Sequence, residues 1–324
     1  MSSGGGMPDR GRRPAGEVVE QGFHWSVFFN WATGAAAFLI LAILLVIIGN
    51  IVWLGAGGLS WRFVSTGTEA GMFDPETAGV LPMIVGTAAR VILMTIFVMP
   101  VGVVTAIYLT EYARETSWLT RVIRGAVNNL AGVPSIVFGL FGLGFFISFV
   151  GTGLDSWLNP ESHAPVWGKA ALVWASLTLA VMTMPVVIVA TEEALLAIAP
   201  GLREASMALG ATKLQTIWKV VLPQALPGIL TGAILAISRA AGEVAPILFT
   251  GAAYYMAKLP RSLSDQFMDL GYHVFILSTQ SPNIDQTRPL LYSTVLVLLL
   301  LTFTLNLVAI FVRARIRRRF RALY

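Results

Sequence analysis

The chain has 324 residues, of which 56% are hydrophobic and 12% are charged, and its formal net charge at pH 7 is +5. Soluble domains carry about 25% charged residues, so this composition excludes an ordinary soluble fold and indicates an all-α, polytopic membrane protein. The excess of positive charge is explained by the basic cytoplasmic ends of membrane helices rather than by nucleic-acid binding.

Residues 1–30 form the first segment of the chain. Its beginning, MSSGGGMPDRGRRPAGE, is rich in Gly, Ser, Pro and charged residues, which predicts disorder because such a sequence buries little apolar surface. No apolar stretch follows it at once, so it lacks the pattern of a cleavable signal peptide. Residues 23–31 are rich in aromatic residues, and we expect them to lead into the membrane at its interface.

Residues 31–312 form a transmembrane domain with six apolar runs, each close to the ~20 residues that cross a hydrocarbon core. We place the spans at residues 32–54, 82–109, 130–150, 169–191, 224–251 and 290–312. Lys and Arg are concentrated in the two termini and in the loops after the second and fourth spans. The positive-inside rule therefore predicts that both termini lie in the cytoplasm. The last segment, residues 313–324, is a basic tail suited to anionic lipid.

Residues 200–223, between the fourth and fifth spans, have the pattern of two short amphipathic helices. Pro200 starts the first helix, and we expect Glu204 in its first turn, where a negative charge suits the helix dipole. Gly210 supplies a sharp break, and Thr212 and Gln215 have the spacing of a capping box.

The second of these helices has a predicted apolar face and a predicted end. Its face is formed by residues at helical spacing: Leu214, Ile217, Trp218, Val221 and Leu222. We expect the helix to end at Pro223, since proline disrupts a helix interior. The pattern alone favours a helix pair that lies on the membrane surface.

The spacing E-A-S-x3-G-x9-V-x-L-P in this loop adds a more specific signal. It resembles the cytoplasmic loop motif E-A-A-x3-G-x9-I-x-L-P of permease subunits from ATP-binding-cassette importers. The matching residues are Glu204, Ala205, Gly210, Leu222 and Pro223, with mild departures at Ser206 and Val220. The resemblance implies that the loop docks on an ATPase subunit and couples nucleotide-driven motion to the membrane helices.

Arg90, Arg239 and Glu243 are the ionisable residues well inside the predicted spans. Each is a hypothesis for the substrate pathway, because an unpaired charge in a membrane costs about 3 kcal/mol on insertion scales. Arg239 and Glu243 are four residues apart and share one face of the fifth span. They form either a salt bridge buried between helices or a charged point on a polar pathway. For Arg90 we favour a side chain that snorkels to the interface.

Two stretches resemble phosphate importer permeases. SRAAGEVAPILFTGA, at 238–252, resembles the signature R-A-x-G-E-x-A-P-x-L-F-T, and NNLAGVPSIVFGLFG, at 128–142, is similar to A-G-V-P-S-I-V-x-G-L-F. Gly132 and Pro134 can break a helix, and the next helix start would offer amide donors to an anion. We favour the alternative of a helix-packing seam built on small residues: Gly132, Gly139, Gly142 and Gly144.

Several kinds of site are absent from the sequence. It has no cysteine, and its three histidines, His24, His163 and His273, are far apart, so we expect no metal centre. It contains no G-x-x-x-x-G-K-[ST] motif and therefore no ATP site of the usual kind. We expect the acidic residues at span ends to be solvated rather than catalytic: Glu111, Glu115, Glu192 and Glu193.

Together these resemblances imply a PstA-type permease subunit of the bacterial phosphate ABC importer, which carries inorganic phosphate into the cytoplasm by alternating access. The implied partners are a second permease of PstC type, a PstB-type ATPase dimer that holds ATP and Mg²⁺, and a periplasmic phosphate-binding protein of PstS type. A cofactor within this chain is not expected. Two alternatives stay open, a permease for another oxyanion such as sulfate or molybdate, and a secondary transporter driven by an ion gradient.

Overall fold

The computed structural model describes residues 15–68, 71–114, 116–158, 160–161, 164–256 and 258–321, with side chains described from residue 27 to residue 318. Residues 1–14, Glu115 and His163, on which predictions were made, lie outside this part. The chain divides into two compact units, Met1–Trp53 and Leu54–Tyr324.

The first unit is essentially one helix, α1 (Ala15–Gly55), and the aromatic lead-in is part of it without a break. Its apolar stretch begins the candidate span Val27–Gly58, and no residue in the most apolar part of this span is buried inside the protein. A helix that is apolar on all sides and unburied fits a hydrocarbon environment. The helix therefore contains the predicted first span.

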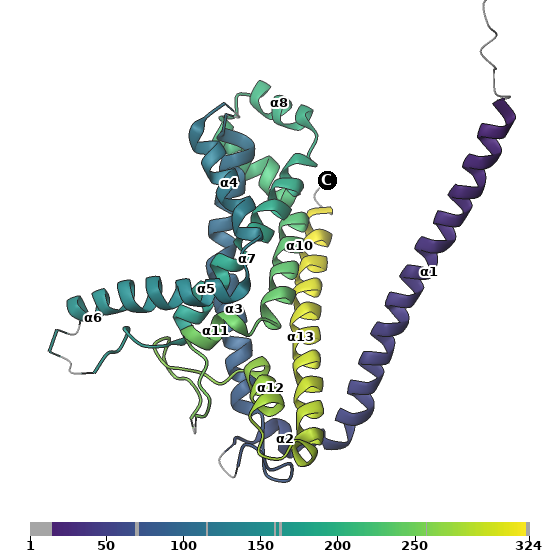
Figure 1. The fold of residues 1–324 in the computed structure, drawn as a ribbon. Coiled ribbons are helices and arrows are strands. Elements are labelled where there is room, and N and C mark those ends of the chain that lie inside the picture. The colour runs from purple at the N-terminus through teal and green to yellow at the C-terminus, as the bar shows by residue number, and fades with distance from the viewer. Residues whose placement is uncertain are drawn as a thin grey trace, which may run out of the picture. The chain divides into compact units, whose positions relative to one another are not determined.

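The second unit holds the five remaining spans. Most of its long helices run the length of the bundle, whereas the helix from Ser135 to Leu158 lies across them (Figure 1). These spans are Leu81–Tyr112, Ser135–Leu158, Leu172–Leu196, Lys213–Ala241 and Ile284–Arg318. With α1, six helices are long and apolar enough to cross a membrane among the residues that the structure describes, so the predicted fold class is confirmed.

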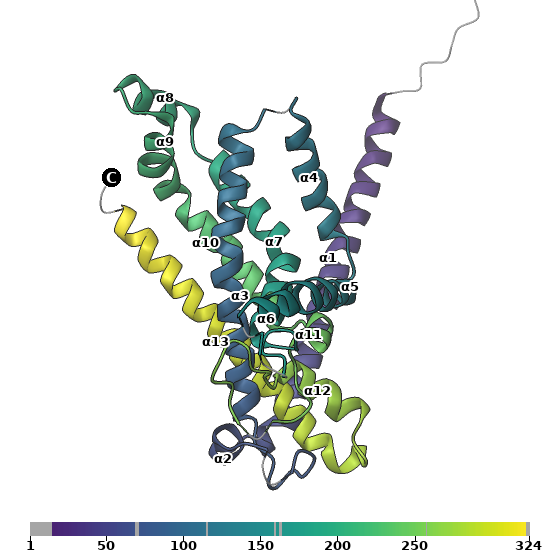
Figure 2. The same cartoon turned by 90° about the vertical axis from the view of Figure 1, so that its left-hand side faces the viewer.

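Helix α7 (Leu172–Leu196) lies at the centre of the bundle, and 72% of its apolar window is buried. It packs against α3 (Leu81–Ile107) and α10 (Leu222–Ala241), as Figures 1 and 2 show. Helix α13 (Ile284–Arg321) runs beside α10 and contacts α12 (Leu270–Thr279). The core between α3, α7 and α10 is formed by buried side chains that include Met94, Val98, Leu179, Val187 and Ala236.

The third span differs from its prediction at its start. Residues expected in a charged loop form α4 (Trp118–Ala131), a strongly amphipathic helix. The chain then breaks at Gly132 and Pro134, as predicted, and α5 (Ser135–Phe141) begins a continuous helix through a π-helical segment, Gly142–Gly151, to α6 (Thr152–Leu158). Leu130 therefore belongs to the amphipathic helix and not to the span.

The fifth span also differs from its prediction. Helix α10 ends at Ala241, and a separate short helix, α11 (Ala245–Thr250), follows a break at Gly242. Pro246 has no N–H and restricts the residue before it, so it suits the start of a new helix better than the interior of a continuous one. The predicted run to residue 251 is thus two helices.

A second hydrophobic cluster lies at the end of the bundle that carries α2 (Trp61–Ser65) and α12 (Figure 1). It joins the start of α3, the loop before α12 and the start of α13 through Phe63, Met83, Met268 and Leu290, all buried. This cluster fixes the loop residue Asp269, which takes part in the site described below.

Candidate functional site

The loop that carries the E-A-S motif forms α8 (Pro200–Ala208) and α9 (Lys213–Thr216) at the end of the bundle opposite α12 (Figures 1 and 2). Gly210 joins them with a φ of 87°, which only glycine adopts without strain. The predicted capping box is present, because Thr212 Oγ1 accepts from Gln215 N at 3.3 Å and Gln215 Oε1 accepts from Thr212 N at 2.9 Å. The local turn chemistry was therefore read correctly.

Two details of this loop correct the predictions. Glu204 lies one turn later than expected, because the first turn of α8 contains no acidic residue. Pro223 does not end the second helix, since it lies in the first turn of α10 and the helix runs on from Lys213 to Ala241. A π-helical turn, Ile217–Val221, precedes the proline. This wider turn shifts the carbonyl groups that its ring would otherwise meet.

The predicted apolar face of the second helix is divided between two environments. Ile217 and Val221 are buried against the bundle, whereas Leu214 and Trp218 are each 58% exposed. Leu209, just before the glycine turn, is 90% exposed. Glu204 and Ala205 are also exposed, while Ser206 is partly buried. The motif therefore presents a mixed surface that the chain itself leaves uncovered.

Arg90 does not snorkel to an interface, and that prediction is wrong. Its side chain is fully buried, and its Nε donates to Asp269 Oδ2 at 2.6 Å. Its Nη1 and Nη2 donate to the carbonyl oxygens of Ala240 and Ala241 at 2.8 and 3.1 Å. These carbonyls belong to the last turn of α10, whose acceptors have no partner within the helix. Arg90 thus caps α10 from the side of α3.

Asp269 completes this buried network. Its Oδ2 also accepts from Thr87 Oγ1 at 2.8 Å, and its Oδ1 accepts from the N–H of Tyr272 at 3.1 Å, which caps α12. Thr87 in turn accepts from the N–H of Leu270 at 3.0 Å. Because every nitrogen of Arg90 and both oxygens of Asp269 have partners, the pair is satisfied inside the protein.

Arg239 and Glu243 do approach each other, but not as two residues of one helix. Arg239 lies in the last turn of α10, where a cation suits the helix dipole, and Glu243 follows the helix end. The distance from Arg239 Nε to Glu243 Oε1 is 3.7 Å, too long for a hydrogen bond, and the side chains are 43% and 23% exposed. This pair is open, in contrast to the buried Arg90–Asp269 pair.

The predicted glycine seam is correct at two of its four positions. A side chain at Gly139 would meet Phe249 and Pro246 of α11, and one at Gly142 would meet Thr178 of α7 and Thr250 of α11. Gly144 faces open space, and Gly132 serves as the cap of α4. The seam holds α5 and the following π-helical segment against α7 and against α11, the helix that follows the break in the fifth span.

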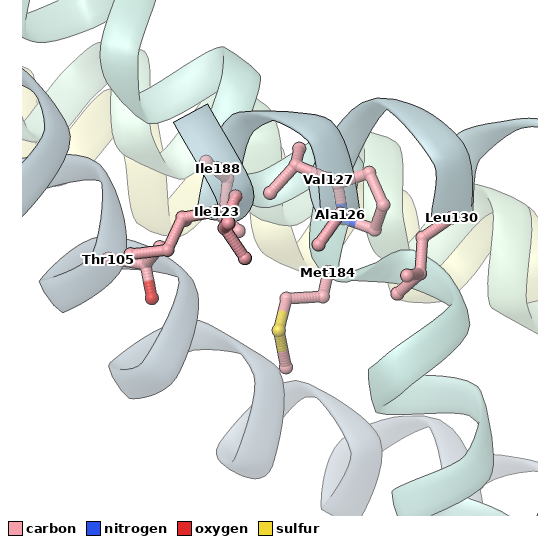
Figure 3. A pocket seen from close by; sticks show the side chains of 9 residues that line it. Thr105, Ile123, Ala126, Val127, Leu130, Met184 and Ile188 are labelled. Atoms are coloured by element: carbon pink, nitrogen blue, oxygen red, sulfur yellow. The ribbon is translucent and has the colours of Figure 1, made fainter. Parts of the chain in front are cut away.

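An apolar hollow between α3, α4 and α7 has a volume of about 240 Å³ (Figure 3). Its lining is Thr105, Val122, Ile123, Ala126, Val127, Leu130, Met184, Pro185 and Ile188. The only hydroxyl in this lining, on Thr105, already donates to the carbonyl oxygen of Val101 at 2.8 Å. The hollow offers no donor set for an anion, because a desolvated charge needs charged or hydrogen-bonding partners.

Sequence reasoning missed an ion pair that joins the loop to the bundle. Glu111, expected to be solvated, is only 9% exposed and pairs with Arg203 of α8 at 2.8 Å. Glu192 is also shielded and lies 3.4 Å from Arg124, whereas Glu193 is exposed as expected. Arg203 directly precedes the motif Glu, but no local spacing marks its partner 92 residues away.

Residues 99–322 match the protein family described as "Binding-protein-dependent transport system inner membrane component". The chain is 35% identical over 211 residues to "Phosphate transport system permease protein PstA 1" of Mycobacterium tuberculosis (strain CDC 1551 / Oshkosh), which covers 61% of this chain and 62% of that protein. It is 34% identical to the PstA protein of Yersinia pestis, over 68% of this chain and 64% of that one. The chain therefore spans slightly less than two thirds of the length of these relatives.

Two solved structures share the fold. A bacterial ABC transporter "involved in the import of the acidic polysaccharide alginate" superposes with a TM-score of 0.59 at 16% identity, over 90% of this chain and 98% of that chain. The inward-facing MetNI methionine ABC transporter superposes with a TM-score of 0.51 at 22% identity, over 74% and 94%. At such low identity the likeness establishes the architecture of ABC importer permeases and nothing about the cargo.

Proposed function

Because the chain belongs to the inner membrane component family of binding-protein-dependent transport systems, we propose that it is the permease subunit that carries inorganic phosphate into the cytoplasm. The observation that carries this proposal is the open Arg239–Glu243 pair at the end of α10. The pair lies within the membrane-spanning bundle, level with the residues that Arg90 caps. A charge at such a depth faces a polar path or a partner subunit, because lipid cannot solvate it.

The guanidinium of Arg239 gives this site a group that can bind an anion. Arg239 has only a loose contact with Glu243, so its guanidinium can exchange that partner for the oxygens of a phosphate group. The break after Ala241 supports this role, since irregular backbone at membrane depth is tolerated where it lines a cavity. The resemblance of residues 238–252 to phosphate permeases and the PstA relatives support phosphate over sulfate or molybdate as the cargo.

The exposed surface of α8 and α9 suits a cytoplasmic ATPase partner of PstB type. It combines the motif residues Glu204, Ala205, Ser206 and Gly210 with the protruding Leu209. ATP and Mg²⁺ would be held by that partner, because these 324 residues contain no phosphate-binding loop. Leu222 and Pro223 begin α10, so a movement of this loop acts directly on the helix whose last turn carries Arg239.

The remaining partners follow from the same reasoning. We propose a second, PstC-type permease against the open face of α10, and a periplasmic PstS-type protein that delivers phosphate at the α12 end. Both termini and α8 then lie in the cytoplasm, as the distribution of Lys and Arg predicts. Transport proceeds by alternating access of the path beside Arg239.

The experiment is phosphate uptake by the assembled transporter in liposomes, with ATP inside and phosphate-loaded binding protein outside. Uptake should need ATP, and an excess of sulfate or molybdate should not compete. Glu204→Lys should abolish uptake while the protein still inserts and melts normally. Glu193→Lys, the same charge change at an exposed acid of the neighbouring α7, is the matched control. Normal uptake by Glu204→Lys would exclude the coupling role of Glu204. Competition by sulfate would contradict the proposal that phosphate is the cargo.

A further inference from the structure

Arg203 holds α8 to two other helices at once. Its Nε and Nη2 donate to Glu111 Oε1 at 3.0 and 2.8 Å, and Glu111 lies in the π-helical turn Tyr108–Tyr112 that continues α3. Its Nη1 donates to the carbonyl oxygen of Ile198, and Nη2 also donates to that of Leu195, both at 2.8 Å. Leu195 belongs to the end of α7, where carbonyl groups lack partners within the helix. One guanidinium therefore joins α8, α3 and α7.

The second loop helix is fixed to the same point. Lys213, the first residue of α9, donates to the carbonyl oxygen of Glu111, and its ammonium lies 4.9 Å from the centre of the Tyr112 ring. The hydroxyls of Ser206 and Thr216 lie 2.9 Å apart and join α8 to α9. The whole loop is thus bound to the end of α3 by side chains from both of its helices.

The contact between Arg203 and Glu111 holds α8 rigidly. Arg203 and Glu111 are 19% and 9% exposed, so water weakens their attraction much less than that of a surface pair. The planar guanidinium fixes its acceptors in direction as well as in distance, which an ammonium cannot do. Without this pair, α8 would connect to α7 through residues 197–199, and to α9 through the turn at Gly210 and the contact between Ser206 and Thr216.

Helix α3 continues this connection to the site. Glu111 follows its cytoplasmic end, and Arg90, on the same helix, holds the carbonyls of Ala240 and Ala241 beside Arg239. A helix is stiff along its axis because its backbone N–H groups are bonded within it. Pro100 lies between Arg90 and Glu111 and has no N–H, so one such bond is missing, but α3 continues through it from Leu81 to Ile107. A displacement of α8 therefore reaches the break in the fifth span through α3 as well as through α10.

We propose that Arg203 and Glu111 are positioning residues, whose contact makes the coupling loop move as one body with α3 and α7. This inference rests on the proposed function, since it presumes an ATPase that moves α8. It assigns to the α3 route the task of transmitting that movement to Arg239. Neither residue touches the cargo in this account.

The first experiment measures phosphate transported per ATP hydrolysed by the assembled transporter. Arg203→Lys keeps the charge but cannot serve Glu111 and both carbonyls together, so transport per ATP should fall about tenfold, within the usual range of coupling free energies between sites. Arg124→Gln, which breaks the longer and partly exposed Arg124–Glu192 pair, is the matched control and should change the ratio by less than about twofold. An unchanged ratio in Arg203→Lys, even with a lower yield of assembled protein, would overturn the proposal.

A second experiment does not depend on the folding of that variant or on the cargo. The chain has no cysteine, so Val104→Cys on α3 and Leu214→Cys on α9, both at exposed positions, accept spin labels specifically. With Arg203 intact, the distance between the labels should be the same in the nucleotide-free and ATP-trapped transporter. A change in this distance between the two states would overturn the proposal. An assembly that hydrolyses ATP without importing phosphate would instead count against the proposed cargo.

Discussion

Two arginine–carboxylate pairs meet near the end of α10, and they differ in every physical respect. Arg90 and Asp269 are fully buried and 2.6 Å apart, with their other polar atoms bonded to Thr87, Tyr272 and two carbonyls. Arg239 and Glu243 are partly exposed and 3.7 Å apart. The first pair connects α3, the end of α10 and the start of α12, whereas the second pair lies at the end of α10 alone.

This contrast indicates that the two pairs have different roles, although they lie at the same depth in the bundle. A buried pair whose atoms are all bonded cannot release a charge to a solute without leaving the other charge unpaired, which is expensive. A loose, partly exposed pair costs little to open. We therefore attribute the support of the helix break to Arg90, whereas the proposed function gives the contact with the cargo to Arg239. The following variants test this division, in order of expected effect.

Arg90→Met should have the largest effect on stability. It leaves the Asp269 carboxylate buried without its charged partner and removes the side-chain donor of the Ala240 and Ala241 carbonyls. The free energy of unfolding should fall by about 3–5 kcal/mol, as thermal denaturation in detergent will measure. The double variant Arg90→Met with Asp269→Leu should recover part of the loss, because no charge remains buried. A single variant that melts like the wild type would show that the pair is not structural.

Glu243→Gln should have a smaller effect, and on transport rather than on stability. Arg239 keeps its charge but loses the carboxylate that restrains its orientation, so phosphate uptake should fall by about threefold. The melting temperature should stay close to that of the wild type, because a partly exposed pair contributes less than about 1 kcal/mol. Loss of folding in this variant would show that the Arg239–Glu243 pair, like the buried pair, is needed for stability.

His273 on α12 should make the stability of the folded protein sensitive to acid. Burial lowers the pKa of His273 from 6.5 to about 4, and neither ring nitrogen has a hydrogen-bond partner among the described residues. Between these two pH values the imidazole is protonated in the unfolded chain but neutral in the folded chain. The free energy of unfolding should therefore decrease as the pH is lowered from about 6.5 to about 4, by up to about 1.4 kcal/mol per pH unit. His273→Leu should flatten this dependence in detergent melts. An equal slope in both proteins would exclude His273 as its cause.

The sequence was informative wherever the signal is local. Apolar run length predicted the six spans, and the spacing of Thr212 and Gln215 predicted a capping box that the structure contains. Gly210 was expected at a sharp turn, and its positive φ agrees. These features depend on neighbouring residues alone, which is why a pattern of a few residues was sufficient.

The partners of the charged residues were not predictable in this way. Arg90 and Asp269 are separated by 179 positions, and Arg203 and Glu111 by 92. Hydropathy treats each of these charges alone, so Arg90 was expected at an interface and Glu111 in water. The prediction for Pro223 was also wrong. A proline next to a π-helical turn need not end a helix, and this turn was not apparent in the sequence. Only the packing of α3 against α10 and the contact of Glu111 with Arg203 of α8 reveal these roles.

The most direct test of the division between the two pairs is phosphate uptake by Arg239→Gln in the assembled transporter, at matched amounts of folded protein. The variant should melt like the wild type, since its pair is partly exposed, and its uptake should fall by about tenfold or more because the pathway loses its cation. Wild-type uptake by a stable Arg239→Gln transporter would contradict the assignment of this residue to the phosphate path.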